Sequence, residues 1–186
     1  MKYICLNLKL IQMEDQQKPT NKTALYYGVI LGIATILVSV ILYALGMHYD
    51  QDWKQSTFSI LAIAVVIFIG IKKFKEINGG YLTLGQAIKT GLGIAVIGGI
   101  ISVIYTFVFI NYIEPDFMTK IAEIQEQTML ERFPNLTDEQ MEQQLEMMKK
   151  FSSPGIIAAF GLIYVLFIGF IASLISGLIL RKKEDQ

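Results

Sequence analysis

Few side chains in this sequence could do chemistry together, and one group of them lies between two apolar stretches. His48 is the only histidine, and Asp50 and Asp52 follow it. An imidazole beside two carboxylates can move protons or hold a cation. A single histidine with two carboxylates in a short loop is more often a solvated surface group, and we favour that interpretation.

The sequence contains no other catalytic or metal-binding pattern. Cys5 is the only cysteine, so the chain can form neither an internal disulfide nor a Cys/His zinc site. There is no nucleophile elbow, no phosphate-binding glycine loop and no HExxH motif. We therefore expect a protein that is not an enzyme and that binds no cofactor, metal ion or nucleic acid.

Three tyrosines, Tyr43, Tyr105 and Tyr164, lie in apolar stretches without charged residues. A charged side chain inside a membrane would be the usual sign of an ion or proton path. Tyrosines more often form hydrogen bonds between helices or an aromatic belt at the interface, which is the interpretation we favour. The alternative is a small polar cavity around the three tyrosines.

The composition places all these side chains in an integral membrane protein. Hydrophobic residues make up 53% of the 186 residues, charged residues make up 17%, and the mean hydropathy is +0.49. An ordinary soluble domain is less apolar. Four stretches can cross roughly 30 Å of hydrocarbon as helices, the second with help from flanking Trp and Lys residues. They are residues 24–46, 56–72, 90–113 and 154–180.

The sequence therefore predicts an all-α fold, an integral membrane four-helix bundle with an external helical hairpin between the third and fourth helices. The membrane domain covers residues 22–184, and we expect the preceding lead, residues 1–21, to be disordered. The lead lacks the small-residue cleavage site of a signal peptide. A translation start at Met13 fits the sequence as well as one at Met1.

The external hairpin is expected in the acidic loop 114–153. Apolar side chains recur at helical spacing on both sides of a break at Pro134. Thr137 and Gln140 have the spacing of a capping box that begins the second helix. We interpret the two stripes as packing between the hairpin helices, and a groove for a partner protein is the alternative. The stripes are Phe117, Ile121, Ile124 and Thr128, and then Met141, Leu145 and Met148.

Lysine and arginine residues predict the orientation, because positively charged flanks are retained in the cytoplasm. They are concentrated in the lead, in the loop after the second stretch and in the C-terminal tail. The first loop and the much longer loop 114–153 carry fewer of them. Both termini are therefore expected in the cytoplasm.

Small residues at four-residue spacing allow helix backbones to approach closely within a membrane. We interpret three such faces as packing inside one bundle, and a homo-oligomer formed through one of them is the alternative. The second stretch has no such face. The faces are Gly28 and Gly32 on the first helix; Gly91, Ala95 and Gly99 on the third; and Gly169, Ser173 and Gly177 on the fourth.

The polar segment from Gly80 to Gly91 precedes the third stretch. On a helix, Thr83, Gln86 and Lys89 share one side. This pattern is typical of an amphipathic approach helix at the cytoplasmic interface, with a bend into the membrane near Gly91. The alternative is the start of the third helix itself, with Lys89 extended toward the headgroups.

Two segments carry a family resemblance: "NGGYLTLGQAIKTG" precedes the third stretch, and "NYIEPDF" ends it. With the long acidic loop and a last span that ends in "RKKE", the chain resembles the domain of unknown function family 4199, which consists of uncharacterised bacterial membrane proteins. The resemblance covers about residues 22–184. It implies a four-span bacterial inner-membrane protein, and it supplies no activity and no catalytic residue.

Two functions are expected for such a chain in the lipid bilayer. The first is a non-enzymatic accessory protein that contacts another envelope protein or the lipid surface through the external loop 114–153. The second is a small transporter or channel subunit, which would use the tyrosine groups and the glycine-rich helices.

Overall fold

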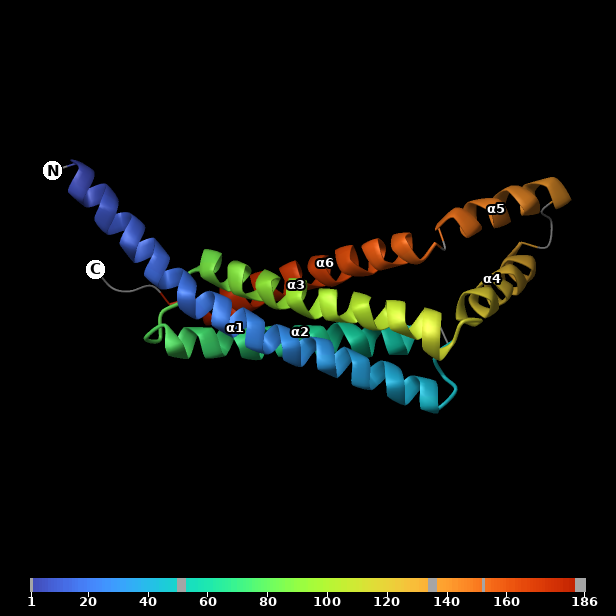
Figure 1. Ribbon diagram of the computed structural model, residues 1–186, viewed down its shortest axis with the longest axis horizontal. Coiled ribbons are helices and arrows are strands. Elements are labelled where there is room, and N and C mark those ends of the chain that lie inside the picture. The colour runs from blue at the N-terminus through green and yellow to red at the C-terminus, as the bar shows by residue number, and fades with distance from the viewer. Residues whose placement is uncertain (1, 50–52, 134–136, 152, 183–186) are drawn as a thin grey trace. The chain divides into compact units, whose positions relative to one another are not determined.

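The computed structural model of the chain describes residues 2–49, 53–133, 137–151 and 153–182 (Figure 1). The described residues form helices and turns, with one isolated bridge between Leu82 and Lys182. This confirms the predicted all-α fold. The chain divides into two compact units. We name Met1–Ser102 with Tyr164–Gln186 the bundle unit, and Val103–Ile163 the hairpin unit.

Four described helices are long and apolar enough to cross a membrane, as predicted, and the chain is a multi-pass membrane protein. The second extends to Ile77, beyond the expected 56–72, so its length alone is sufficient. The third includes a short π-helix at its C-terminal end. The spans are Thr20–Ala44 in α1 (Lys2–Ala44), Ser56–Ile77 in α2 (Trp53–Ile77), Leu84–Ile113 in α3 (Leu84–Val108) with η1 (Phe109–Ile113), and Pro154–Leu180, which is α6.

The first helix is longer than its apolar part. α1 begins at Lys2, whereas its candidate span begins at Thr20. The helix therefore does not start where the apolar residues start. The expected disorder of residues 1–21 stays a prediction.

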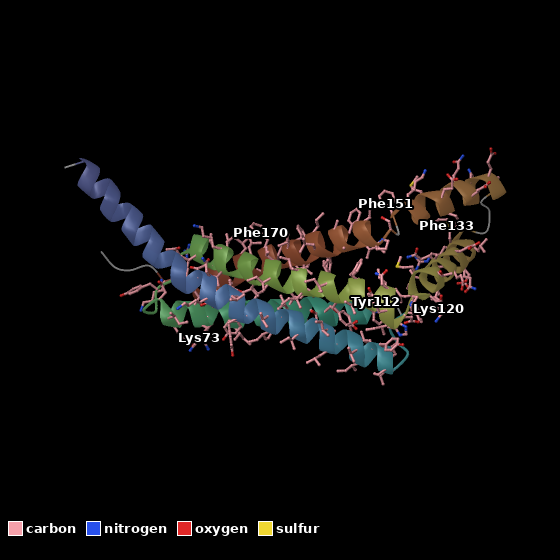
Figure 2. All side chains as sticks on the ribbon, in the orientation of Figure 1. Lys73, Tyr112, Lys120, Phe133, Phe151 and Phe170 are labelled. Carbon is pink, nitrogen blue, oxygen red and sulfur yellow. The ribbon has the colours of Figure 1, made fainter. Side chains whose placement is uncertain are left out.

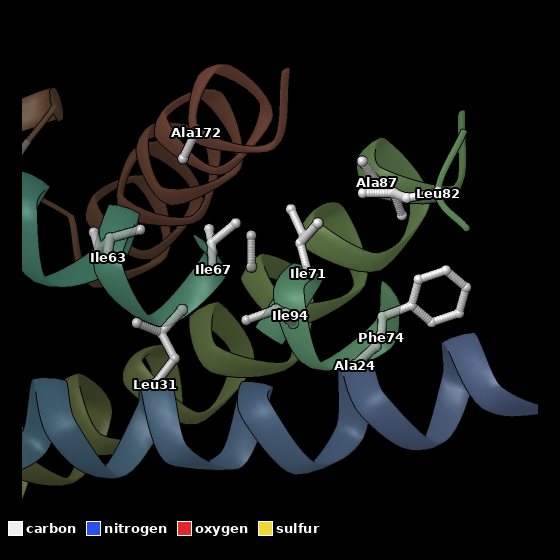
Figure 3. Packing of buried hydrophobic residues seen from close by; sticks show 11 residues of the cluster. Ala24, Leu31, Ile63, Ile67, Ile71, Phe74, Leu82, Ala87, Ile94 and Ala172 are labelled. Atoms are coloured by element: carbon white, nitrogen blue, oxygen red, sulfur yellow. The ribbon is translucent and has the colours of Figure 1, made fainter. Parts of the chain in front are cut away.

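The core of the bundle unit is built around a stripe of large side chains on α2 (Figure 3). Ile63, Ile67, Ile71 and Phe74 recur at helical spacing, and each is at most 4% exposed. Several of the residues that pack with this stripe are small, which brings the helices close together and increases dispersion contacts. The other helices contribute Ala24 and Leu31 from α1, Ala87, Ile94 and Ala95 from α3, and Ala172 from α6.

α1 and α3 pack in parallel through glycines. A Cβ atom added to Gly28 would lie 2.6 Å from the Cβ atom of Ile97, and Gly32 makes an equally close approach one turn later. One turn further on, the hydroxyls of Thr35 and Ser102 lie 2.8 Å apart and share a hydrogen bond. Hydrogen bonds of this kind add to packing between helices in lipid.

The outward face of the bundle unit is apolar. Leu37, Leu61, Phe167 and Ile179 are between 57% and 67% exposed. Side chains of this size on several helices form a surface that is unfavourable in water and favourable in hydrocarbon. The bundle unit therefore has the surface that a lipid environment requires.

Candidate functional site

The chain between η1 and α6 contains two further helices, α4 (Phe117–Arg132) and α5 (Asp138–Phe151). The capping box predicted before α5 is confirmed. The backbone N–H of Thr137 donates to Oε1 of Gln140 at 3.2 Å, and the backbone N–H of Gln140 donates to Oγ1 of Thr137 at 3.4 Å. These bonds satisfy donors at a helix start that would otherwise depend on water. The start of α5 is thus fixed locally.

The described side chains of the two hairpin helices bury little of their apolar surface. No residue of α4 is buried. Leu130, Phe133, Met147 and Phe151 are each more than half exposed, and Figure 2 labels the two phenylalanines. Large apolar side chains are therefore present on the surface of the hairpin unit, which is where a partner could contact them.

The stripes predicted to pack between the hairpin helices are described only in part. Ile121 and Leu145 are half-buried, and Ile124 is 37% exposed. The side chains of Met141 and Met148 lie outside the described residues. The described members of the stripes therefore do not form a core as closed as that of the bundle unit.

The NYIEPDF segment connects α3 to α4. It includes the end of η1, which is closed by a hydrogen bond from the Glu114 N–H to the Phe109 carbonyl at 2.8 Å. The Glu114 carboxylate pairs with the Lys120 ammonium at 3.1 Å. The rings of Phe109 and Phe117 meet edge to face, with centres 5.4 Å apart. These contacts attach the first turn of α4 to η1, so this family segment has a structural role.

The polar segment before α3 begins as a turn after α2. Gly79 and Gly80 have φ angles of +69° and +86°, in the left-handed region where glycine is favoured. The side-chain amide of Asn78 donates to the carbonyl of Tyr81 at 2.9 Å. The sequence Asn-Gly-Gly therefore fixes the turn that reverses the chain between α2 and α3.

Thr83 and Gln86 then form a second capping box at the start of α3. The Thr83 N–H donates to Oε1 of Gln86 at 2.9 Å, and the Gln86 N–H donates to Oγ1 of Thr83 at 3.2 Å. This role was not predicted, although the Thr-x-x-Gln spacing is the same as at Thr137. The polarity of the two side chains therefore has a local structural use.

α3 runs uninterrupted from Leu84 through Gly91. The polar segment therefore forms the first turns of α3, and whether these turns lie at the interface stays a prediction. Thr90 is fully buried, whereas Lys89 is exposed on the same helix. The depth of Lys89 and of the capping residues relative to the headgroups stays a prediction.

The same segment pairs with the chain that follows the C-terminal end of α6. The Leu82 N–H donates to the Lys182 carbonyl at 2.9 Å, and the Lys182 N–H donates to the Leu82 carbonyl at 3.0 Å. Leu82 is fully buried, and the Lys182 ammonium lies 5.8 Å from the centre of the Tyr81 ring. The NGGYLTLGQ segment and the start of RKKE, both part of the family pattern, are therefore in direct contact.

Two of the predicted small-residue faces pack against each other, antiparallel, in what we name the α3–α6 seam. A Cβ atom added to Gly91 would collide with Ser173, and one added to Gly169 would lie 2.6 Å from the Cβ of Ala95. These faces are occupied within the chain, and a homo-oligomer stays a prediction. The facing pairs are Gly91 with Ser173, Ala95 with Gly169, and Ala87 with Gly177, and Gly99 is buried as well.

The three tyrosines are divided between the two units. Tyr43 and Tyr164 belong to the bundle unit and are 38% and 43% exposed. Tyr105 belongs to the hairpin unit, where its ring centre lies 5.9 Å from that of Phe109. A polar cavity around the three tyrosines therefore stays a prediction.

A small pocket lies between α1 and α2 in the bundle unit, with a volume of about 90 Å³. Its surface is mostly apolar, and the tyrosines are not part of it. It is lined by Leu31, Ala34, Val38, Phe58 and Ala62 together with the hydroxyl-bearing Thr35 and Ser59.

The cluster around the histidine is described only in part. The centre of the His48 ring lies 5.0 Å from that of Tyr43 and 4.0 Å from that of Tyr49. Asp50 and Asp52 lie outside the described residues. Within the described ranges, no group of three His, Cys, Asp or Glu side chains could hold a metal ion.

Four apolar helices that pack closely through glycines define an α-helical multi-pass membrane protein. The family described as "Protein of unknown function (DUF4199)" matches residues 26–182. The match covers most of the chain, so the chain belongs to this family, and the predicted resemblance is confirmed. Neither the curated proteins nor the solved structures include a match to the chain.

Proposed function

We propose that this chain is a non-enzymatic accessory protein of the bacterial inner membrane that binds another envelope protein through the α4–α5 hairpin. One observation carries the proposal: large apolar side chains are exposed on a hairpin whose helix starts are fixed locally. A preformed helical surface loses less conformational entropy on binding than a disordered loop does. Exposed apolar groups on such a surface favour association with a partner.

The charge of the hairpin favours a protein partner over lipid headgroups. Glu123, Glu126, Glu142 and Glu146 are all exposed on α4 and α5. An anionic membrane surface would repel these carboxylates. A protein surface with basic side chains around an apolar patch would attract both the carboxylates and the apolar groups.

The proposal includes an orientation with both termini in the cytoplasm. Its support is the clustering of Lys72, Lys73, Arg181 and Lys182 near the ends of α2 and α6, because positive flanks are retained in the cytoplasm. The hairpin then follows the outer end of α3 and is external. An export-dependent phosphatase should be inactive when fused to the C-terminus and active when inserted within residues 138–150. The reverse pattern would overturn the orientation.

Site-specific photo-crosslinking in the native host tests the partner. A photoreactive amino acid at Leu130 or Met147 should yield a discrete cross-linked protein, because both side chains are more than half exposed. Gln127 and Gln144 are exposed polar positions on the same helices and serve as matched controls that should cross-link weakly. Equal labelling at all four positions would contradict the proposal.

A further inference from the structure

The bundle unit has a larger pocket between the start of the α1 span and the end of α2, with a volume of about 360 Å³. We name it the basic pocket, because Lys22 on α1 and Lys73 on α2 both line it; Figure 2 labels Lys73. The two ammonium groups come from helices far apart in the sequence. The full lining is Lys22, Thr23, Tyr26, Tyr27, Lys73 and Ile77.

The basic pocket lies where two spans end. The α1 span begins at Thr20, and the α2 span ends at Ile77. The pocket is therefore at the boundary between hydrocarbon and headgroups. Lysine side chains at this level keep their methylene groups in the apolar region and extend their ammonium groups to the headgroups. Tyrosine rings favour the same level.

The polar groups of the basic pocket are suited to a phosphate. Ammonium and hydroxyl groups donate to phosphate oxygens, and bonds between ionised partners are stronger than neutral ones. Lys22 and Lys73 each supply up to three donors, and the hydroxyls of Tyr26 and Tyr27 can add further ones. Basic pockets between membrane helices are a known type of site for anionic lipid headgroups.

The apolar part of the lining favours a lipid over a free phosphate ion. Tyr26 and Ile77 are 65% and 56% exposed. The ring of Tyr26 stands edge to face on that of Tyr27, with centres 5.2 Å apart. Glycerol and the first acyl carbons of a phospholipid would cover these apolar surfaces, whereas inorganic phosphate would leave them uncovered.

One carboxylate competes for Lys73. Glu76 lies 2.9 Å from the Lys73 ammonium, and both side chains are about half exposed, at 53% and 52%. An exposed pair at this spacing contributes little to stability, so the ammonium can turn to a phosphate. The Lys22 ammonium contributes the second positive charge from the opposite helix.

We propose that the basic pocket binds the phosphate headgroup of an anionic phospholipid, held between Lys22 on α1 and Lys73 on α2. The bound lipid joins the start of the first span to the end of the second. This site is separate from the α4–α5 hairpin, so it does not depend on the proposed envelope partner.

Lipid retention by purified protein tests the proposal. Native mass spectrometry would compare phosphatidylglycerol with phosphatidylcholine on the full chain and on Lys22→Gln/Lys73→Gln. The matched control is Lys72→Gln/Lys75→Gln. It also removes two positive charges, both from the end of α2 that carries Lys73, and neither residue lines the pocket. We expect the wild type to retain phosphatidylglycerol preferentially. The affinity of the pocket variant for this lipid should be lower by a factor of about ten or more.

Further variants and a competitor make the result specific. Lys22→Arg/Lys73→Arg keeps both charges and should retain the lipid, while circular dichroism should show the helices of every variant intact. Equal retention of the two lipids by the wild type, or an equal loss in the control variant, would overturn the proposal. Displacement of the lipid by inorganic phosphate alone would show that free phosphate is the ligand, which would also overturn it.

Discussion

The bundle unit and the hairpin unit use apolar residues in opposite ways. In the bundle unit, large side chains on α2 such as Ile67 and Phe74 are completely buried, and glycines on the other helices let backbones meet. In the hairpin unit, α4 has no buried residue, and Leu130 and Phe133 are more than half exposed. The bundle unit is held by contacts between distant segments, while the hairpin helices depend on local devices such as the Thr137 capping box.

This difference indicates where the chain is specialised for stability and where it is available for contact. A substitution in the α3–α6 seam should destabilise the fold without any partner present. A substitution on the hairpin surface should leave the fold unchanged and affect association alone. Stability and binding can therefore be tested with separate sets of variants.

The largest effect on stability is expected when a single methyl group is added in the α3–α6 seam. Gly91→Ala places its Cβ against Ser173, whose own Cβ would lie at 2.8 Å, so rotation of the serine hydroxyl cannot relieve the contact. We expect the free energy of unfolding to fall by about 2 kcal/mol or more, because overpacking of a tight interior typically costs roughly 1–3 kcal/mol. Thermal unfolding in detergent micelles would measure it.

The control for this substitution lies in the same helix. Gly85→Ala adds the same methyl group where nothing lies within 4 Å, and alanine favours a helix over glycine by about 0.5–1 kcal/mol. It should therefore be neutral or stabilising, as should Gly161→Ala in the hairpin unit, which also meets open space. If Gly91→Ala melts at the same temperature as these two, the seam is not tightly packed.

Features that depend on a short stretch of sequence could be predicted, whereas contacts between distant stretches could not. Uncharged apolar runs predicted all four spans, because roughly twenty such residues are required to cross a bilayer. The Thr137 box was predicted from four residues. The capping box at Thr83 has the same spacing and could have been predicted too. The amphipathic pattern around it instead led us to interpret the segment as an interfacial helix.

The contacts that a sequence could not predict each join two segments that are far apart in the chain. No pattern in the neighbouring sequence indicates the bridge between Leu82 and Lys182, because the two residues are single and far apart in the sequence. Gly70 on α2 lacks a small neighbour at four-residue spacing, yet a Cβ there would lie 3.1 Å from the Tyr27 ring. Its close approach depends on which helix lies opposite, which is information that one helix does not contain.

A smaller effect is expected at the turn before α3. Gly80→Ala forces an alanine into a left-handed conformation with φ of +86°, which costs about 1–2 kcal/mol, and no neighbouring atom adds to this cost. Because the turn leads directly into the Leu82–Lys182 bridge, the bridge amides should also exchange hydrogen faster. Gly46→Ala imposes similar strain at φ of +70° but leads into no bridge, so the bridge amides should be unaffected. Equal hydrogen exchange of the bridge amides in the two variants would show that the bridge does not depend on the turn.

The same motif, a capping box, occurs in both units, so its loss can be compared between them. Thr83→Ala and Thr137→Ala each remove a helix cap worth about 1 kcal/mol. The start of α3 is also held by buried residues and the nearby bridge, so Thr83→Ala should lower the stability of the whole bundle slightly. None of the described side chains of α5 is buried, so Thr137→Ala should increase hydrogen exchange in α5 alone, at an unchanged melting temperature. A loss of global stability with Thr137→Ala would show that the hairpin is integral to the folded core.

The smallest effect on stability is expected on the hairpin surface. Phe133→Ser and Leu130→Ser change side chains that are 57% and 51% exposed, so each should shift the free energy of unfolding by no more than about 0.5 kcal/mol. If a protein partner covers these side chains in the cell, the same substitutions should abolish the cross-link formed from Met147 while the purified protein melts normally. Gln127→Ser is the matched control and should change neither property. A clear fall in melting temperature with Phe133→Ser would mean that the ring is used for folding, and the contrast between a buried bundle and an available hairpin would no longer hold.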